Sequence, residues 1–254
     1  MHTIDINCDM GEGLGPNNGQ GLDVALMDYV SSINIACGFH AGSPAIMQDT
    51  VQAAVRRGIA IGAHPGLPDR GSFGRRPQPI TPQEAYRVTL YQIGALHAFV
   101  KAEGLALNHV KPHGALYNMA AVDRKLAEAI VQTIVDFDPR LVLYGLSGSE
   151  LIHAAQRAGI AVANEVFADR TYQSDGSLTP RGHAGSIIGN EAAAIAQVTS
   201  LVFHHQAISA DGTPVSLTAE TLCIHSDSPY ALSFAKAVHT YLQRAQVKIQ
   251  PTTR

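Results

Sequence analysis

Seven short apolar runs of β-forming residues alternate along the chain with segments that carry helix start and stop signals. The runs cover residues 4–8, 33–37, 59–63, 107–110, 141–144, 161–166 and 222–225. Such alternation is typical of parallel strands joined by right-handed helical crossovers. We therefore expect an α/β fold with seven parallel strands. No linker or low-complexity segment interrupts the pattern, so we expect a single domain over residues 1–254.

Capping residues mark where the helices between these runs begin. The expected helices start at Ser43, Thr81, Asp123, Ser147 and Ser228. Proline at the first helical position and a capping box between Thr81 and Glu84 strengthen these signals. The stretches 65–79 and 169–189 carry no such signals and are candidates for active-site loops. The turn at 210–214 predicts a hairpin before the last strand.

The side-chain alternation in the first run favours a closed barrel over an open, doubly wound sheet. One face carries apolar Ile4, Ile6 and Cys8, and the other carries polar Asp5, Asn7 and Asp9. A central strand of an open sheet is covered by helices on both faces and is expected to be apolar on both. A polar face is instead typical of a barrel interior that opens to a site. We therefore predict a β/α barrel.

Charge and composition exclude two classes of partner. The net charge is −3 and no block of Lys or Arg occurs, which argues against nucleic acid and against an anionic membrane. No apolar stretch reaches the length of about 18 residues that a membrane span needs. Cys8, Cys37 and Cys223 lie in apolar runs, and we expect them to be free, buried thiols. Because strand-like sequence begins at Thr3 with no signal peptide before it, we expect a cytoplasmic protein.

Three apolar runs lead to a histidine that glycine follows closely, at His40, His64 and His113. The C-terminal ends of parallel strands meet at one edge of the fold, where active sites are assembled. We expect the three imidazoles to lie together and to act as metal ligands, proton shuttles or oxyanion donors. A helical metal pair of His109 and His113 is excluded, because Pro112 cannot occupy a helix interior there.

Acids and bases on the inward face extend this candidate site. Buried acids are costly unless they are paired or bind a metal, so we expect a function for Asp9 or Glu12. The deeper Asp5 is expected to be a structural hydrogen-bond partner. Lys111 needs an anion, either a substrate carboxylate or a structural salt bridge. The remaining candidates, for substrate binding, are Asn7, Arg75, Arg76, Glu165, Asp169, Arg170 and His225.

Three common motifs are missing from the sequence. No Gly-x-x-x-x-Gly-Lys-Ser/Thr phosphate loop occurs, and the glycines at 11, 13 and 15 do not have the dinucleotide-binding spacing. No Gly-x-Ser-x-Gly nucleophile elbow is present. No motif predicts an organic prosthetic group.

Several of these segments, taken as continuous blocks, resemble the LamB/YcsF family. The blocks are 5–12, 34–42, 62–66, 73–76, 110–118, 164–170 and 223–225, and they extend over nearly the whole chain. One departure is Ser226, where the family tends to have glycine. The resemblance implies a seven-stranded β/α barrel similar to that of polysaccharide deacetylases, which agrees with the strand count.

The resemblance also implies a function. The family's characterised role is the A component of bacterial 5-oxoprolinase, which acts with partner subunits B and C to open the lactam 5-oxo-L-proline to L-glutamate with hydrolysis of ATP. This chain would supply the barrel in which the ring opens, with ATP and Mg²⁺ handled mainly with the partners. Asp9 or Glu12 would act as general base, and the histidines as acids or oxyanion donors. Lys111 or an arginine would hold the substrate carboxylate.

Two other classes of function stay open. A metal-dependent deacetylase or amidohydrolase on the same barrel would use Asp9, His40 and His64 as ligands of a divalent metal. A non-catalytic interaction subunit would not need the polar interior. The sequence leaves open whether a metal is bound and whether the chain forms a homo-oligomer.

Overall fold

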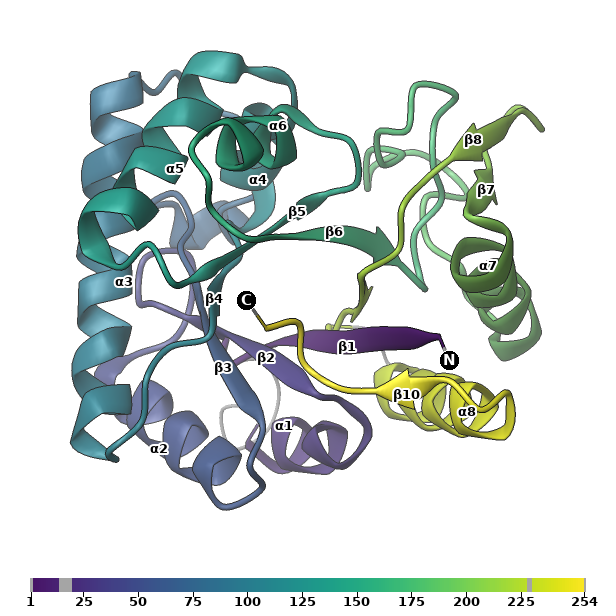
Figure 1. The fold of residues 1–254 in the computed structure, drawn as a ribbon, viewed down its shortest axis with the longest axis horizontal. Helices are drawn as coiled ribbons and strands as arrows, with labels where there is room; N and C mark the ends of the chain where they lie inside the picture. The colour runs from purple at the N-terminus through teal and green to yellow at the C-terminus, as the bar shows by residue number, and fades with distance from the viewer. Residues whose placement is uncertain (1, 14–19, 228–229, 254) are drawn as a thin grey trace.

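The computed structural model describes residues 2–13, 20–227 and 230–253. At its centre is a closed barrel of parallel strands (Figure 1). The strands are β1 (Thr3–Met10), β2 (Ser32–Ala36), β3 (Ala60–His64), β4 (His109–Val110), β5 (Val142–Leu146), β6 (Val162–Phe167) and β9 (Thr221–Ile224). Each strand pairs with the next in this order, and β9 pairs in turn with β1. The predicted seven-stranded barrel is therefore confirmed, and the open sheet is excluded.

The α-helices cover the outside of the barrel. They are α1 (Gln20–Leu26), α2 (Pro44–Val55), α3 (Pro82–Ala102), α4 (Gly114–Val122), α5 (Arg124–Phe137), α6 (Glu150–Arg157), α7 (Glu191–His204) and α8 (Ala231–Arg244). Two short 3-10 helices, η2 (Met27–Tyr29) and η3 (Arg70–Ser72), lie in connections. In Figure 1, α2, α3 and α5 line one flank of the barrel, and α7 and α8 cover the other.

Side-chain caps place several helix starts where the sequence predicts them. The Ser43 hydroxyl accepts a hydrogen bond from the Ile46 amide, and Asp123 caps α5 in the same way. Thr81 and Glu84 form the expected capping box. Each such cap contributes about 1 kcal/mol to the stability of its helix. The expected start of the last helix, Ser228, lies outside the described residues.

Two further strand pairs lie beside the barrel. Strands β7 (Gln206–Ile208) and β8 (Pro214–Ser216) form an antiparallel hairpin, which confirms the hairpin predicted from the turn. Strand β10 (Lys248–Ile249), which the sequence signals did not predict, adds to the start of β1 in parallel. Figure 1 shows the hairpin near α7 and β10 alongside β1.

The alternation of side chains along β1 separates an apolar core, between the strands and the helices, from a polar barrel interior. Ile4, Ile6, Cys8 and Met10 are buried in the apolar core that the strands share with the helices. Each large apolar side chain in this core contributes about 1.5–3 kcal/mol by its burial. Asp5, Asn7 and Asp9 point the other way, into the barrel, and are also buried. The predicted polar barrel interior is therefore present.

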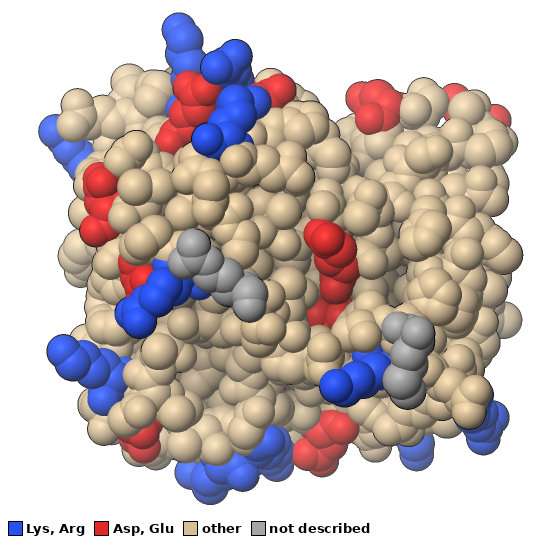
Figure 2. All heavy atoms as spheres, in the orientation of Figure 1, with Lys and Arg blue, Asp and Glu red and all other residues tan. Residues whose placement is uncertain are grey.

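The charged surface is mixed in sign. In Figure 2, acidic and basic side chains are scattered over the visible face, and a cluster of both signs lies over α5 and α6. Ion pairs in that region include Arg157–Glu128 at 3.6 Å and Arg124–Glu128 at 2.7 Å. No broad basic area is visible on this face. Within the described part of the chain, none of the helices combines the length and the apolar character that crossing a membrane requires.

Candidate active site

The deepest polar group in the barrel is Asp5. Its carboxylate accepts hydrogen bonds from the hydroxyls of Ser31 (2.6 Å), Ser32 (2.7 Å) and Thr221 (2.6 Å). Burial raises the pKa of Asp5, and the three hydroxyls partly offset this effect. Asp5 lies toward the N-terminal end of β1, away from the barrel mouth, and it has the hydrogen-bond partners expected of a structural group.

Two asparagines, Asn7 and Asn34, form the next level of polar side chains, nearer the barrel mouth than Asp5. Asn34 on β2 donates to Asn7 Oδ1 (2.7 Å) and to Asp9 Oδ1 (2.8 Å). Asn7 donates to Glu165 Oε1 (3.0 Å) and to Thr221 Oγ1 (2.8 Å). Asn7 and Glu165 are fully buried and do not line the cavity described below. They are therefore placed to position the residues above them rather than to contact a substrate.

Lys111 connects this level to the barrel mouth. Its ammonium lies 3.0 Å from Asp9 Oδ1 and 2.8 Å from Glu165 Oε1, and it also contacts Asn7 Oδ1 and Cys223 Sγ. Burial by itself lowers the pKa of Lys111, but Asp9, Cys223 and Glu165 raise it well above its usual value. Of the two anions considered for Lys111, the structure therefore provides the internal carboxylates.

Asp9 stands where this network meets the cavity. Its Oδ2 lies 3.3 Å from His64 Nε2, while Oδ1 contacts Lys111. Burial by itself disfavours the carboxylate form. The charges of His64, when protonated, and of Lys111 outweigh burial and hold the pKa of Asp9 well below its usual value. Asp9 is thus a buried carboxylate that stays ionised at the floor of a cavity.

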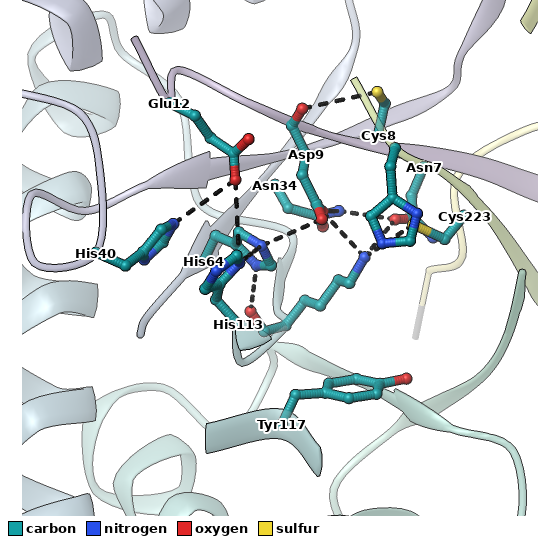
Figure 3. A network of polar contacts seen from close by, with 12 residues as sticks. Asn7, Cys8, Asp9, Glu12, Asn34, His40, His64, His113, Tyr117 and Cys223 are labelled. Carbon is teal, nitrogen blue, oxygen red and sulfur yellow. Dashed lines mark hydrogen bonds and ion pairs between the residues drawn. The ribbon is translucent and has the colours of Figure 1, made fainter. Parts of the chain in front are cut away.

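His40, His64 and His113 converge at the mouth, as predicted, and Glu12 points toward them (Figure 3). The rings of His40 and His113 are stacked, with centroids 3.7 Å apart. Glu12 Oε1 lies 3.7 Å from His40 Nε2 and 3.9 Å from His113 Nδ1. One donor atom from each of the four residues lies within 4.8 Å of the others, so the group could hold a metal ion.

The loop after β3 shapes this cluster. A Cβ at Gly66 would lie 2.4 Å from His40 Nδ1, so only glycine leaves room for the ring. Phe73, in the same loop, has φ 57°, a left-handed conformation that is strained for a non-glycine residue. This conformation presents the Phe73 carbonyl to His113 Nε2, which donates to it at 2.8 Å. The loop therefore fixes the orientation of two of the three histidines.

Burial controls the charge of the cluster. It lowers the pKa of His40 and His113 well below the usual value, and repulsion from neighbouring imidazoles adds to the effect. Burial and the nearby Asp9 raise the pKa of Glu12 well above its usual value. In the absence of a cation, the site therefore favours neutral His40 and His113 rings and a protonated Glu12.

A histidine–aspartate pair, His225 and Asp169, lies on the other side of Asp9 from the three-histidine cluster. His225 follows β9, and its Nδ1 lies 2.9 Å from Asp169 Oδ2, after β6. The His225 amide donates to the same oxygen at 3.3 Å, and the imidazole stacks on Phe167. Burial raises the pKa of Asp169, but His225 reverses this and lowers it. Asp9, Cys223 and His225 form a second set whose donor atoms lie within 4.8 Å of one another.

A cavity of about 600 Å³ opens above these groups. Its floor includes Asp9, His64, Lys111, His113 and His225. The predicted loops 65–79 and 169–189 form part of its wall. The cavity therefore brings together the acids and bases that the sequence predicts, with room for a small molecule.

The arginines at the entrance differ in role. Arg75 and Arg181 both contact Asp227 Oδ2, at 2.6 and 3.2 Å, and both line the cavity. Arg170 also lines the cavity, but it is buried and donates to the carbonyls of residues 179 and 186, which links two parts of its loop. The Arg76 side chain is 71% exposed, pairs with Asp69, and does not line the cavity.

Sequence reasoning did not single out Asn34 or Tyr117. Asn34 interrupts the apolar run 33–37, and the same alternation that revealed Asn7 marks it as inward-facing. Tyr117 donates to Glu165 Oε2 at 2.7 Å from helix α4. No sequence signal marked α4, since no side-chain cap bond begins it.

Fold and site together define a seven-stranded β/α-barrel protein whose buried acids and histidines gather at the C-terminal mouth of the barrel. The chain belongs to the LamB/YcsF family, whose sequence pattern matches residues 4–254. The predicted resemblance is thereby confirmed over nearly the whole chain.

Similar proteins agree with this assignment. A Geobacillus thermodenitrificans protein, named as the A component of 5-oxoprolinase, is 54% identical over 250 residues, which cover 98% of this chain and 97% of that protein. The crystal structure of a lactam utilization protein from Thermus thermophilus matches with a TM-score of 0.90 and 44% identity, covering 98% of this chain and 100% of that one. The catalytic domain of a peptidoglycan N-acetylglucosamine deacetylase from Eubacterium rectale shares the fold at 13% identity, with a TM-score of 0.51 over 99% of this chain and 88% of that one.

Proposed function

We propose that this chain is the component of an ATP-dependent 5-oxoprolinase in which the lactam ring of 5-oxo-L-proline is opened to L-glutamate. The observation that carries the proposal is the cavity floor, which combines an ionised carboxylate, Asp9, with a carboxylate-bound histidine, His225. Membership of the family and the name of the Geobacillus relative support the choice of substrate.

Arg75 and Arg181 are the groups that we assign to the substrate carboxylate. Asp227 already brings one carboxylate oxygen within 2.6 and 3.2 Å of the two guanidinium groups. A guanidinium matches a planar carboxylate in both charge and shape. The substrate carboxylate therefore binds in the position that Asp227 now shares, at the cavity entrance.

Asp9 and His225 supply the proton transfers. Asp9 takes a proton from the water molecule that attacks the ring carbonyl carbon. His225, oriented by Asp169, gives a proton to the ring nitrogen as the bond between carbon and nitrogen breaks. Ring opening gives a free amino group, and the former ring carbonyl carbon becomes the second carboxylate of L-glutamate once phosphate has left.

ATP is needed because a lactam carbonyl is a weak electrophile. We assign to ATP the phosphorylation of the lactam oxygen. Water attack and cleavage of the carbon–nitrogen bond then give an acyl phosphate, and a second water molecule hydrolyses it to the carboxylate and inorganic phosphate. Because the chain contains no P-loop motif, we place ATP and Mg²⁺ at a site formed mainly with partner subunits B and C. The free, buried cysteines support a cytoplasmic location for this complex.

Reconstitution with the partner subunits tests the proposal. Release of L-glutamate and hydrolysis of ATP are measured with 5-oxo-L-proline while this chain is omitted, restored, or replaced by Asp9→Asn. We expect glutamate release only when the chain is present. Loss of the general base in the variant reduces the rate by about 100-fold or more.

Asp28→Asn is the matched control, because Asp28 is an exposed carboxylate that pairs with Arg57 away from the cavity. It keeps the wild-type rate, and circular dichroism verifies that both variants are folded. A wild-type rate for Asp9→Asn would contradict the proposal and favour a non-catalytic interaction subunit. Glutamate release by this chain without ATP would instead favour the metal-dependent amidohydrolase.

A further inference from the structure

We propose that Glu12, His40, His64 and His113 form a binding site for one divalent transition-metal ion of the Zn²⁺ class at the barrel mouth (Figure 3). This proposal goes beyond the proposed reaction, because it stands on the geometry of the four side chains alone. It also gives the three histidines a different task from proton transfer.

Two hydrogen bonds fix the protons on two of the rings. His64 Nδ1 lies 2.7 Å from the carbonyl oxygen of Lys111, and His113 Nε2 lies 2.8 Å from that of Phe73. A carbonyl oxygen can only accept a hydrogen bond, so both of these nitrogens carry the ring proton. In a neutral imidazole the other nitrogen then carries a lone pair.

The two remaining nitrogens face each other. His64 Nε2 and His113 Nδ1 are 2.9 Å apart, so in two neutral rings their lone pairs repel unless a shared proton or a metal ion lies between them. Asp9 Oδ2 adds a further acceptor 3.3 Å from His64 Nε2. The ammonium of Lys111 does not resolve this conflict, because it contacts Asp9 through the other oxygen, Oδ1.

The other two members have the same need for a cation. Within the described residues, neither ring nitrogen of buried His40 has a hydrogen-bond partner. The ion-pair contacts that the described residues give Glu12 are with His40 and His113, at 3.7 and 3.9 Å. An unpaired buried polar group such as the His40 ring is costly, and a metal ion between His40 and Glu12 would satisfy it.

The donor set indicates the class of metal. Three imidazole nitrogens and one carboxylate oxygen suit Zn²⁺ and related first-row ions. Metal-binding histidines usually donate their second ring proton to a carbonyl or carboxylate, as His64 and His113 do here. When bound, such an ion acts as a Lewis acid that polarises a carbonyl oxygen.

Metal analysis of the full-length chain tests the site without any activity assay. Chain purified without chelators is analysed by elemental mass spectrometry, then stripped with dipicolinate and titrated separately with Zn²⁺ and Co²⁺. We expect about one equivalent per chain and a Co²⁺ absorption spectrum typical of nitrogen and oxygen ligands. Bound Zn²⁺ also raises the melting temperature, because it binds only the folded chain.

Three variants and one control identify the ligands. His64→Ala, His113→Ala and the nearly isosteric Glu12→Gln reduce Zn²⁺ affinity by more than the 10–100-fold typical of an outer-shell partner. His153→Ala removes an exposed histidine on α6 and binds Zn²⁺ as the wild type does. Glu12→Gln keeps the test decisive if an alanine variant fails to fold.

Two results would overturn the proposal. One is a wild-type chain that takes up neither Zn²⁺ nor Co²⁺ at millimolar concentration, which would mean that a shared proton satisfies the two rings. The other is a Zn²⁺ affinity equal to that of the wild type in Glu12→Gln and in each of the two histidine variants. Because neither readout involves 5-oxo-L-proline or ATP, failure here is distinct from failure of the proposed reaction.

Discussion

Lys111 shows how one side chain organises the buried charge of the barrel. Its ammonium joins Asp9 on β1 to Glu165 on β6. Removing one partner from a buried group of this kind leaves an uncompensated charge, which costs about 3–5 kcal/mol. The same contacts keep Asp9 ionised, so the stability of the barrel and the proposed general base depend on one residue.

The pair of His225 and Asp169 leads to a prediction about proton transfer. Asp169→Asn places an amide group where the ring and backbone N–H groups of His225 now meet a carboxylate. We expect kcat in the reconstituted reaction to fall by about 100-fold or more, since the ring loses the partner that orients it. KM stays near the wild-type value. Steady-state kinetics at several concentrations of 5-oxo-L-proline separate the two constants.

A double-mutant cycle provides the control for this pair. In a His225→Gln background, Asp169→Asn causes little further loss, because the two residues act as one unit. A rise in KM with unchanged kcat would show instead that Asp169 and His225 only bind the substrate.

Side-chain alternation predicted the residues of β1 well, since a strand places alternate residues on opposite faces. Asp5, Asn7 and Asp9 all lie inside the barrel, as that rule requires. The rule could not find Tyr117, because this residue reaches Glu165 from a helix and from 48 positions away in the sequence. Nor could it show that Arg75 reaches the cavity while Arg76 does not, because the two residues lie in an irregular loop.

At the scale of the elements, local capping chemistry decided which helices could be predicted. Helix α5 begins where the sequence predicts, because Asp123 caps it by accepting hydrogen bonds from two backbone amides. Helix α7 begins with a similar cap, in which Asn190 accepts a hydrogen bond from the Ala193 amide, although the expected helix starts do not include it. Helix α4 begins after His113 without a side-chain cap and depends on tertiary packing, which the local sequence does not encode.

The strand β3 gives a prediction about packing inside the barrel. A Cβ at Gly62 would lie 2.1 Å from His109 Nε2, and the His109 ring is held by stacking on Tyr144. Gly62→Ala therefore overpacks the interior and lowers the free energy of unfolding by about 1–3 kcal/mol. Urea denaturation measures this change.

Gly94→Ala is the matched substitution on helix α3. A Cβ there meets no atom within 4 Å, so the variant gains helix propensity without a clash. We expect it to stabilise the chain by about 0.5–1 kcal/mol. Equal stabilities for the two variants would show that the His109 ring moves aside at little cost, contrary to the packing argument.

The molecule as a whole is defined by the closure of its barrel. Strand β1 pairs with both β2 and β9, which are separated by most of the chain. The polarity of one strand was enough to predict this closure, because an open sheet would have buried the same polar face against helices. The short β10 could not be predicted in this way, since its pairing with β1 adds only two residues outside the ring.

Asp23 on α1 links the stability of the whole molecule to pH. It is buried, and burial raises its pKa from 3.8 to about 6, partly offset by a hydrogen bond from the Gly11 amide. Between these two values the folded chain retains a proton that the unfolded chain has released. The contribution of Asp23 to the stability of the folded state therefore falls as the pH rises through this window.

We expect Asp23→Asn to remove this loss, because an amide can still accept from Gly11 but cannot ionise. The variant exceeds the wild type in unfolding free energy by about 1–3 kcal/mol at pH 7, and the difference shrinks toward pH 4. Urea denaturation of both proteins from pH 4 to pH 8 measures it. The measurement at pH 4 is the internal control, because Asp23 is then protonated in the folded wild type. A difference that stays constant over this range would mean that Asp23 ionises in the folded chain as readily as in the unfolded one.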